Sequence, residues 1–221
     1  GWKLKLVIDG KAPQRLLDSY SEERVCAADE NLLNSTRSTD FITPKSRASR
    51  TFRNAALSLA KDHAFGRGLV NSGRLSVPAF LVDSSLNTSD EDAFAGRMLP
   101  GAPMDDAPVA RDGAPGWLLQ STGNCFRLMV FVDDPASTDT SALSRLAIDG
   151  IPLEPLLVSR VPVTACALPC VHDIRGVAAR RYDARPGTTY LIRPDQHVAA
   201  RWRAFDAEKI LAAVARATCR Q

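Results

Sequence analysis

Residues 96 to 116 contain four prolines and four glycines, and this stretch separates two parts of the chain that have different patterns. Proline removes a backbone hydrogen-bond donor and glycine weakens regular structure, so neither a long helix nor a central strand is expected to run through it. The pattern before it is helical, whereas strand and helix signals alternate after it. We therefore expect an α/β protein in three parts: a helical region at 1–70, an extended arm at 71–116 and an α/β domain at 117–221.

The helical region contains its own start and stop signals. Gly10 ends the first apolar segment, and Pro13 can begin a second helix that places Leu16, Leu17 and Tyr20 on one face. A break at Thr43-Pro44 precedes a basic helical segment from Ser49 to His63, and the helical pattern fades after about Gly66. At the very start Trp2, Leu4 and Leu6 alternate with lysines, so the pattern alone leaves helix and strand open there.

The arm carries more apolar side chains than a bare linker needs. Met98, Leu99, Met104 and Val109 lie among its prolines and glycines. We expect the arm to pack on a surface of the protein.

The last part of the chain has the element order of a thioredoxin-like domain: strand, helix, strand, hairpin, helix. Asp206 is the expected N-cap of the last helix, with Ile210, Leu211 and Val214 on its buried face. The other predicted elements are strands at 127–132 and 153–158, a helix at 141–148, and hairpin strands at 188–193 and 197–202.

A redox-active thioredoxin needs a Cys-x-x-Cys motif directly after its first core strand, where a helix N-terminus lowers the thiol pKa. This chain has Asp133 and Asp134 at that position. Thiol–disulfide exchange is therefore excluded there, and the domain is expected to act as a scaffold.

Cys166, Cys170 and His172 bring two thiols and one imidazole within seven residues. They could be idle side chains, a redox pair, or one edge of a zinc site whose fourth ligand is distant in sequence. His63 and His197 have no nucleophile or carboxylate nearby in sequence to suggest a general base. We assign no catalytic, cofactor-binding or metal-binding residue.

Composition excludes several classes of function. The net charge of +3 comes from 28 basic and 25 acidic residues spread along the chain, which does not indicate nucleic-acid binding. No apolar run approaches the ~20 residues that span a bilayer, and the first residues do not have the pattern of a signal peptide. Five irregularly spaced cysteines argue against a disulfide framework, so we expect a cytoplasmic protein.

Several segments together resemble the FAD-dependent aromatic-ring monooxygenases, a family that includes phenol, hydroxybenzoate and hydroxyphenylpropionate hydroxylases. Trp2-Lys3-Leu4 and the helix pattern that follows resemble the stretch after the family's flavin-binding motif. Arg97 to Met104 and Asp112 to Leu119 resemble its entry into the C-terminal domain. The segment from Arg185 to Trp202 resembles the closing hairpin of that thioredoxin-like domain.

The resemblance implies that this chain is the C-terminal part of such an enzyme, with residues 1–70 as a helical remnant of the FAD and substrate domain. In the family, flavin and NAD(P)H together insert one oxygen atom of O₂ into a phenolic ring. This sequence has no Gly-x-Gly-x-x-Gly motif, so FAD and NAD(P)H are implied for the intact parent and not for this chain. Its role would be structural, in subunit contacts or in shielding the active site.

The expected partners are the parent's own N-terminal flavin domain and a second copy of the chain. Because Trp2 begins an apolar segment without a preceding cap, we expect Trp2, Leu4 and Leu6 to be exposed and to cause self-association. The alternative is a free-standing thioredoxin-like binding module, or a thiol protein that uses Cys166 and Cys170.

Overall fold

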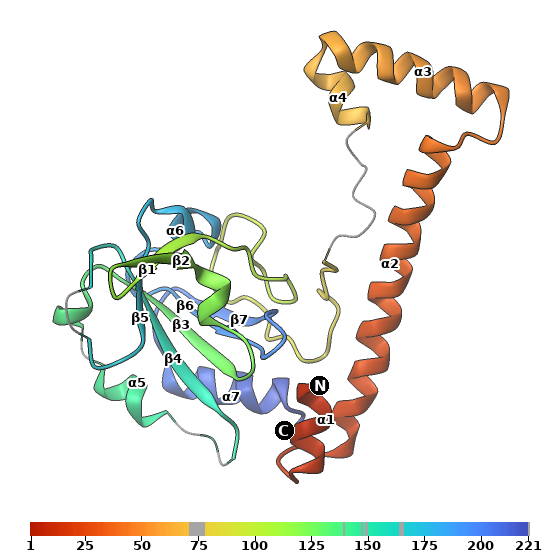
Figure 1. Cartoon of the computed structure of the whole chain (residues 1–221). Coiled ribbons are helices and arrows are strands. Elements are labelled where there is room, and N and C mark those ends of the chain that lie inside the picture. The colour runs from red at the N-terminus through yellow and green to blue at the C-terminus, as the bar shows by residue number, and fades with distance from the viewer. Residues whose placement is uncertain (71–77, 139, 147, 149, 164–165, 221) are drawn as a thin grey trace. The chain divides into compact units, whose positions relative to one another are not determined.

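One mixed β-sheet organises most of the chain. The computed structural model describes residues 1–70, 78–138, 140–146, 148, 150–163 and 166–220 (Figure 1). They form two units, a larger one of residues 1–22 and 80–221 and a smaller one of residues 23–79. The predicted α/β class is confirmed. The predicted boundaries at 70 and 116 stay predictions.

The sheet of the larger unit has the strand order β2-β1-β5-β4-β3-β6-β7. Strands β3, β4 and β5 run parallel, and every other neighbouring pair is antiparallel. The strands are β1 (Pro108–Arg111), β2 (Ala114–Trp117), β3 (Phe126–Val132), β4 (Leu153–Ser159), β5 (Cys170–His172), β6 (Thr189–Ile192) and β7 (Val198–Trp202). The sequence predicted β3, β4, β6 and β7, and the narrower name thioredoxin-like stays a prediction.

Strand β3 is apolar at six of its seven positions because both of its faces are covered. Side chains alternate along a strand, so Phe126, Leu128 and Val130 join one core, and Met129 and Phe131 join the other. The sheet therefore needs a cover on each side.

Helices cover the first face. They are α1 (Trp2–Ile8), the short 3-10 helix η1 (Gln14–Leu17), α5 (Ser141–Arg145) and α7 (Ala207–Ala217). Asp206 caps α7 as predicted, its carboxylate accepting the Lys209 N–H at 3.1 Å. Ile210 and Val214 are buried beneath the sheet. Helix α5 is shorter than predicted and ends at Arg145.

The arm covers the second face, together with α6 (Val177–Arg181). Met98, Met104 and Val109 are buried, which confirms that the arm packs on a surface. Figure 1 shows this yellow-green segment running over the sheet. Residues 71–77, which the prediction placed at the start of the arm, lie outside the described residues.

The predicted arm contains regular structure that the sequence analysis missed. Strands β1 and β2 form a hairpin that pairs with β5 at the end of the sheet, and the 3-10 helix η2 (Leu118–Ser121) follows it. The expected boundary between arm and domain at 116 falls inside β2. Proline and glycine are tolerated here because the hairpin is at the sheet edge.

The first residues form a helix, which decides the question that the pattern left open. Gly10 follows it with φ +67°, a conformation that glycine adopts without strain. The expectation that Trp2 and Leu6 are exposed was wrong, because Leu6 is buried and the Trp2 ring packs on Phe126. Leu4 is exposed, as expected.

The smaller unit holds most of α2 (Asp18–Ile42), with α3 (Arg47–Asp62) and α4 (Ala64–Val70). The break at Thr43-Pro44 is where α2 ends, and the Ser46 hydroxyl caps α3 by accepting the Ser49 N–H at 3.1 Å. The helical region was expected to extend to about residue 70, and α4 ends at Val70. A Cβ at Gly66 would lie 2.7 Å from the Ala60 nitrogen, so α4 packs closely on α3. No helix of the described residues is long and apolar enough to cross a membrane.

Gly101 fixes the arm to the sheet. Its N–H donates to the Val198 carbonyl, and its own carbonyl accepts the Leu81 N–H, each at 2.8 Å. Its φ is +90°, and a Cβ there would lie 2.4 Å from the Leu81 oxygen. The position therefore tolerates no side chain without a backbone shift.

We predict that Gly101→Ala destabilises the protein by about 3 kcal/mol or more, because overlap with the backbone adds to the strain of a positive φ. Gly113→Ala is the matched control, since Gly113 also has a positive φ (+78°) but open space around it. That variant should lose only about 1–2 kcal/mol. Urea unfolding measures both, and equal losses would contradict the prediction.

Candidate functional site

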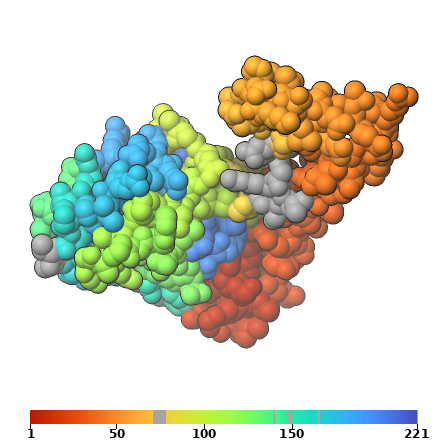
Figure 2. All heavy atoms as spheres, turned by 45° about the horizontal axis from the view of Figure 1, so that its top comes forward, coloured from red at the N-terminus to blue at the C-terminus, as the bar shows by residue number. Residues whose placement is uncertain are grey.

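The N-terminal helix is joined to the far end of the chain through Trp2. The Trp2 indole N–H donates to an Asp195 carboxylate oxygen at 2.9 Å. Its ring meets Phe126 edge-on with centroids 5.5 Å apart, and the Arg193 guanidinium lies 5.4 Å from the ring centre. Figure 2 shows the red residues of α1 against the sheet unit. We call Trp2, Phe126, Arg193 and Asp195 the Trp2 cluster.

Arg193 and Asp195 give this cluster its electrostatic character. Arg193 is fully buried, and its guanidinium donates to both Asp195 oxygens at 3.1 and 2.7 Å. Burial raises the Asp195 pKa, but hydrogen bonds from His197, Arg193 and Trp2, together with the charge of Arg193, lower it by more. The net result is a pKa far below that of an ordinary carboxyl group.

Two further contacts hold the segment that follows α1. Lys3 is buried, and its ammonium donates to the Ser19 hydroxyl at 2.8 Å. Arg15 donates two hydrogen bonds to the Cys219 carbonyl, at 3.1 and 2.6 Å. A cavity of about 550 Å³ lies beside α1, and its lining includes Trp2, Leu6, Phe126 and Pro194. The contact from Arg15 to Cys219 thus joins residues 1–22 to the end of the chain, 204 residues away.

The arm is held by an arginine clasp around one aromatic ring. The guanidinium carbons of Arg201 and Arg203 lie 4.3 and 3.7 Å from the centre of the Phe94 ring, within the range of a cation–π interaction. Arg201 also binds the Asp90 carboxylate at 2.6 Å, and the Arg203 N–H donates to Asp92 at 2.9 Å. Asp90, Asp92 and Phe94 thus attach the arm to Arg201 in β7 and to Arg203 just after it.

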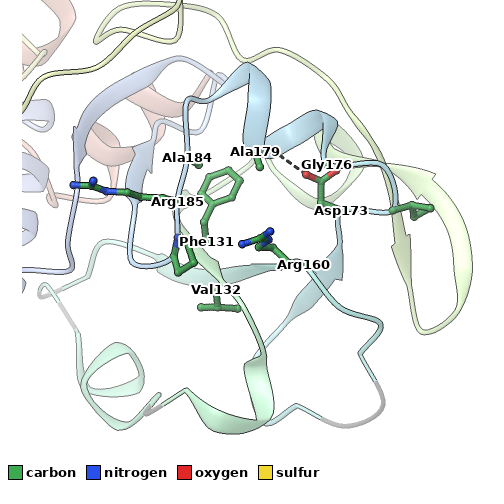
Figure 3. A pocket seen from close by; sticks show the side chains of 10 residues that line it. Phe131, Val132, Arg160, Asp173, Gly176, Ala179, Ala184 and Arg185 are labelled. Carbon is green, nitrogen blue, oxygen red and sulfur yellow. Dashed lines mark hydrogen bonds between the residues drawn. The ribbon is translucent and has the colours of Figure 1, made fainter.

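A cavity of about 490 Å³ opens where the parallel strands β3 and β4 end (Figure 3). Ligands of open α/β sheets commonly bind at this edge. The Asp173 carboxylate accepts the N–H groups of Val177, Ala178 and Ala179 at 2.9–3.2 Å, so these donors at the start of α6 are already used. Arg160 pairs with Asp133 at 3.0 Å. The described lining contains no cysteine, histidine or hydroxyl side chain.

Asp134 and Asp106 have structural roles, because each accepts hydrogen bonds from backbone N–H groups. Asp134 caps the short 3-10 helix η3 (Pro135–Ser137), accepting the Ala136 N–H at 2.9 Å. Asp106 accepts the Ala107 and Leu119 N–H groups, at 2.9 and 3.0 Å. These are the backbone contacts expected of Asp in turns.

Cys166 and Cys170 lie close enough to influence each other, and the surroundings of Cys170 do not favour a thiolate there. Burial raises the pKa of the Cys170 thiol to about 12, and Cys166 adds to the effect. Both are free thiols in β5 and the segment before it. Among the described residues, no three His, Cys, Asp or Glu side chains are grouped to hold a metal ion.

Sequence reasoning missed the Trp2 cluster and the clasp around Phe94. The partners in the cluster are 193 residues apart, and Arg201 is 111 residues from Asp90. A single sequence gives no signal for such pairs. The one local sign was Arg193-Pro194-Asp195, where opposite charges flank a hairpin turn.

We predict that Asp195→Asn destabilises the protein at pH 7 by about 2 kcal/mol or more, because it leaves the buried Arg193 without its counter-charge. The wild-type contribution is full above pH ~4, the usual carboxyl pKa, and declines as pH falls toward the lowered folded-state value. The stability difference between the two proteins should therefore shrink on acidification. Asp83→Asn, at an exposed turn, is the control. A constant difference between pH 7 and pH 3 would contradict this.

We also predict that Cys26, which is exposed, reacts with a maleimide at pH 8 far faster than Cys170. A thiol with a pKa near 12 has only about one ten-thousandth of its population as thiolate at that pH. Peptide mapping after short labelling measures both rates. Equal rates would restore Cys170 as a candidate nucleophile.

Comparison with known proteins shows which solved structures have a similar fold. No protein-family profile matches the sequence, and no curated protein matches it. Many solved structures match the fold, and the following three are among those that match along nearly the whole chain. The flavin-dependent monooxygenase PieE, solved with FAD and substrate, has 23% identity and a TM-score of 0.65 over 100% of this chain. Aklavinone-11 hydroxylase, solved with FAD and aklavinone, has 20% identity and a TM-score of 0.65 over 99%.

The third structure is RebC-10x, in native and K252c-bound forms, with 22% identity and a TM-score of 0.58 over 100% of this chain. The matches cover only 42%, 38% and 38% of those chains. The chain therefore has the fold of a part of flavin-dependent monooxygenases and spans about two fifths of their length.

Proposed function

We propose that this chain is the C-terminal part of an FAD-dependent aromatic-ring monooxygenase, in which it has a structural role. The observation that carries the proposal is that the fold match to PieE extends over 100% of this chain, from α1 through both units. A free-standing thioredoxin-like module would account for the sheet but not for a match that includes α1, α2 and the arm. The family resemblance of Trp2-Lys3-Leu4 supports the same assignment.

The residues of this chain do not suit FAD themselves. Its nearest approach to a nucleotide-binding motif, Gly66-Arg67-Gly68, lies inside α4 and not in a turn between a strand and a helix. No step of the reaction is therefore assigned to this chain. FAD and NAD(P)H belong to the part of the parent that precedes Trp2, where flavin would supply the oxygen transfer to a phenolic ring.

The way in which residues 1–22 are bound supports the proposed structural role. The Trp2 cluster and the Arg15–Cys219 contact tie the first segment to the sheet, so the sheet unit would hold the C-terminal side of the flavin-binding part in place. Shielding of the active site and contact with a second copy are further roles we propose for the sheet unit and the arm. The cytoplasm is the proposed compartment.

We predict that the gene extended upstream through a Gly-x-Gly-x-x-Gly motif yields a yellow protein that oxidises NAD(P)H in the presence of phenolic compounds. The 221-residue chain should stay colourless under the same conditions. Flavin absorbance and NAD(P)H consumption measure the two properties separately. If the extended protein binds no flavin, or if no such upstream sequence exists, the proposal fails.

A further inference from the structure

The walls of the cavity at the end of β3 and β4 are fixed by backbone hydrogen bonds. The Gly187 N–H donates to the Phe131 carbonyl at 2.8 Å, and the Arg160 N–H donates to the Val132 carbonyl at 3.1 Å. The residues that line the cavity all belong to the larger unit. A ligand that binds there meets a site that is already formed and loses little free energy in ordering it.

The size and the lining of the cavity suit the apolar part of a small molecule. Its volume of about 490 Å³ lies within the range of ligand pockets, which is roughly 300–1,000 Å³. Most of the lining is apolar: Phe131, Val132, Ile174, Ala179, Ala184 and Pro186. The Ile174 side chain is 46% exposed. An apolar ligand body would cover part of this surface and remove it from water.

Arg160 supplies an anion-binding group at this cavity, where Figure 3 shows it at the same opening as Phe131 and Asp173. Its guanidinium has five N–H donors, and Nη1 donates to the Asp133 carboxylate at 3.0 Å. Within the part of the chain that the structure describes, this is the guanidinium's only hydrogen bond. Both side chains of the pair are mostly exposed, so the ion pair is weak. The remaining donors of Arg160 are therefore available to a ligand.

The charge around the cavity is positive. The segment from Arg160 to Arg185 contains five arginines and two aspartates, so its net charge of +3 equals that of the whole chain. Both aspartates are occupied, because Asp173 accepts three N–H groups at the start of α6 and Asp183 pairs with Arg203 at 2.5 Å. The Arg185 side chain also lines the cavity and has no hydrogen bond to the described residues. The cavity therefore attracts anions.

We propose that this cavity binds a small organic carboxylate with an apolar body. Arg160 donates to the carboxylate group, and the apolar lining holds the body. A planar guanidinium matches a carboxylate with two parallel hydrogen bonds, and Arg160 already binds one carboxylate of the chain itself, that of Asp133. The N–H groups at the start of α6 take no part, since Asp173 occupies them.

This ligand site goes beyond the structural role proposed above and does not depend on flavin. All of its residues lie in the larger unit of the 221-residue chain. A parent protein without flavin would refute the proposed function and leave the ligand site standing. Absence of ligand binding would refute the site and leave the proposed function standing.

Benzoate is the probe, because it combines a carboxylate with a compact apolar ring. In an NMR titration of the 221-residue chain, the amide signals of Val132, Gly176 and Ala179 should shift and saturate with a Kd of about 1 mM or lower. Benzamide has a similar shape without the charge, and inorganic phosphate has charge without an apolar body. Each should bind at least about tenfold more weakly than benzoate.

Three substitutions separate the parts of the site. Arg160→Gln removes the partner of the carboxylate and should weaken benzoate binding about tenfold or more. Ala179→Leu fills the cavity without changing the charge and should weaken binding by a similar factor. Arg175→Gln is the matched control, because Arg175 is exposed and lies outside the lining, and it should change the Kd by less than about twofold. The dispersion of the amide signals shows whether each variant is folded.

Four results would overturn the proposal. The first is the absence of saturable shifts up to about 20 mM benzoate. The second is equal binding of benzoate and benzamide, which would leave only an apolar cavity, and the third is equal binding of phosphate, which would make the site a general anion site. The fourth is equal weakening by Arg160→Gln and Arg175→Gln, which would indicate a diffuse attraction by the arginines.

Discussion

Strand β3 has to be covered on both faces, and most of the larger unit follows from this need. Its run of apolar side chains, each pointing opposite to the last, would leave a large apolar area in water if either face were open. The two faces are covered by different kinds of structure. Helices α1, η1, α5 and α7 cover one face, and the arm together with α6 covers the other.

The arm is the less obvious cover, because it lacks the internal hydrogen bonds of a helix. It is fixed instead at separate points: the Leu81–Gly101–Val198 backbone contacts, the Tyr182 hydroxyl donating to the Asp105 carbonyl at 2.8 Å, and the clasp of Arg201 and Arg203 around Phe94. Arginine suits the clasp because its flat, weakly hydrated guanidinium can stack on a ring and bind a carboxylate at once. Specific polar contacts thus hold the arm in place, whereas regular hydrogen bonds hold the helices on the other face in shape.

The sequence predicted the features that depend on neighbours in the chain. The apolar run of β3, the capping Asp206 and the stop at Thr43-Pro44 are local signals, and each is found where expected. Strands β1, β2 and β5 were missed, because β5 has three residues and the hairpin contains proline and glycine. The Trp2 cluster was missed for another reason, since Trp2 has an apolar ring that needs a partner but no pattern states that Asp195 supplies it. For the same reason Trp2 and Leu6 were wrongly expected to be exposed.

The hydrogen bond from Trp2 to Asp195 also has a consequence for folding during translation. The two residues are separated by 193 positions, so α1 leaves the ribosome long before its partner exists. At ordinary translation rates the wait is roughly 10 to 40 seconds. During that time Trp2 lacks its partner Asp195, which belongs to the turn between β6 and β7. The contact between Trp2 and Asp195 can therefore form only after most of the larger unit has been synthesised.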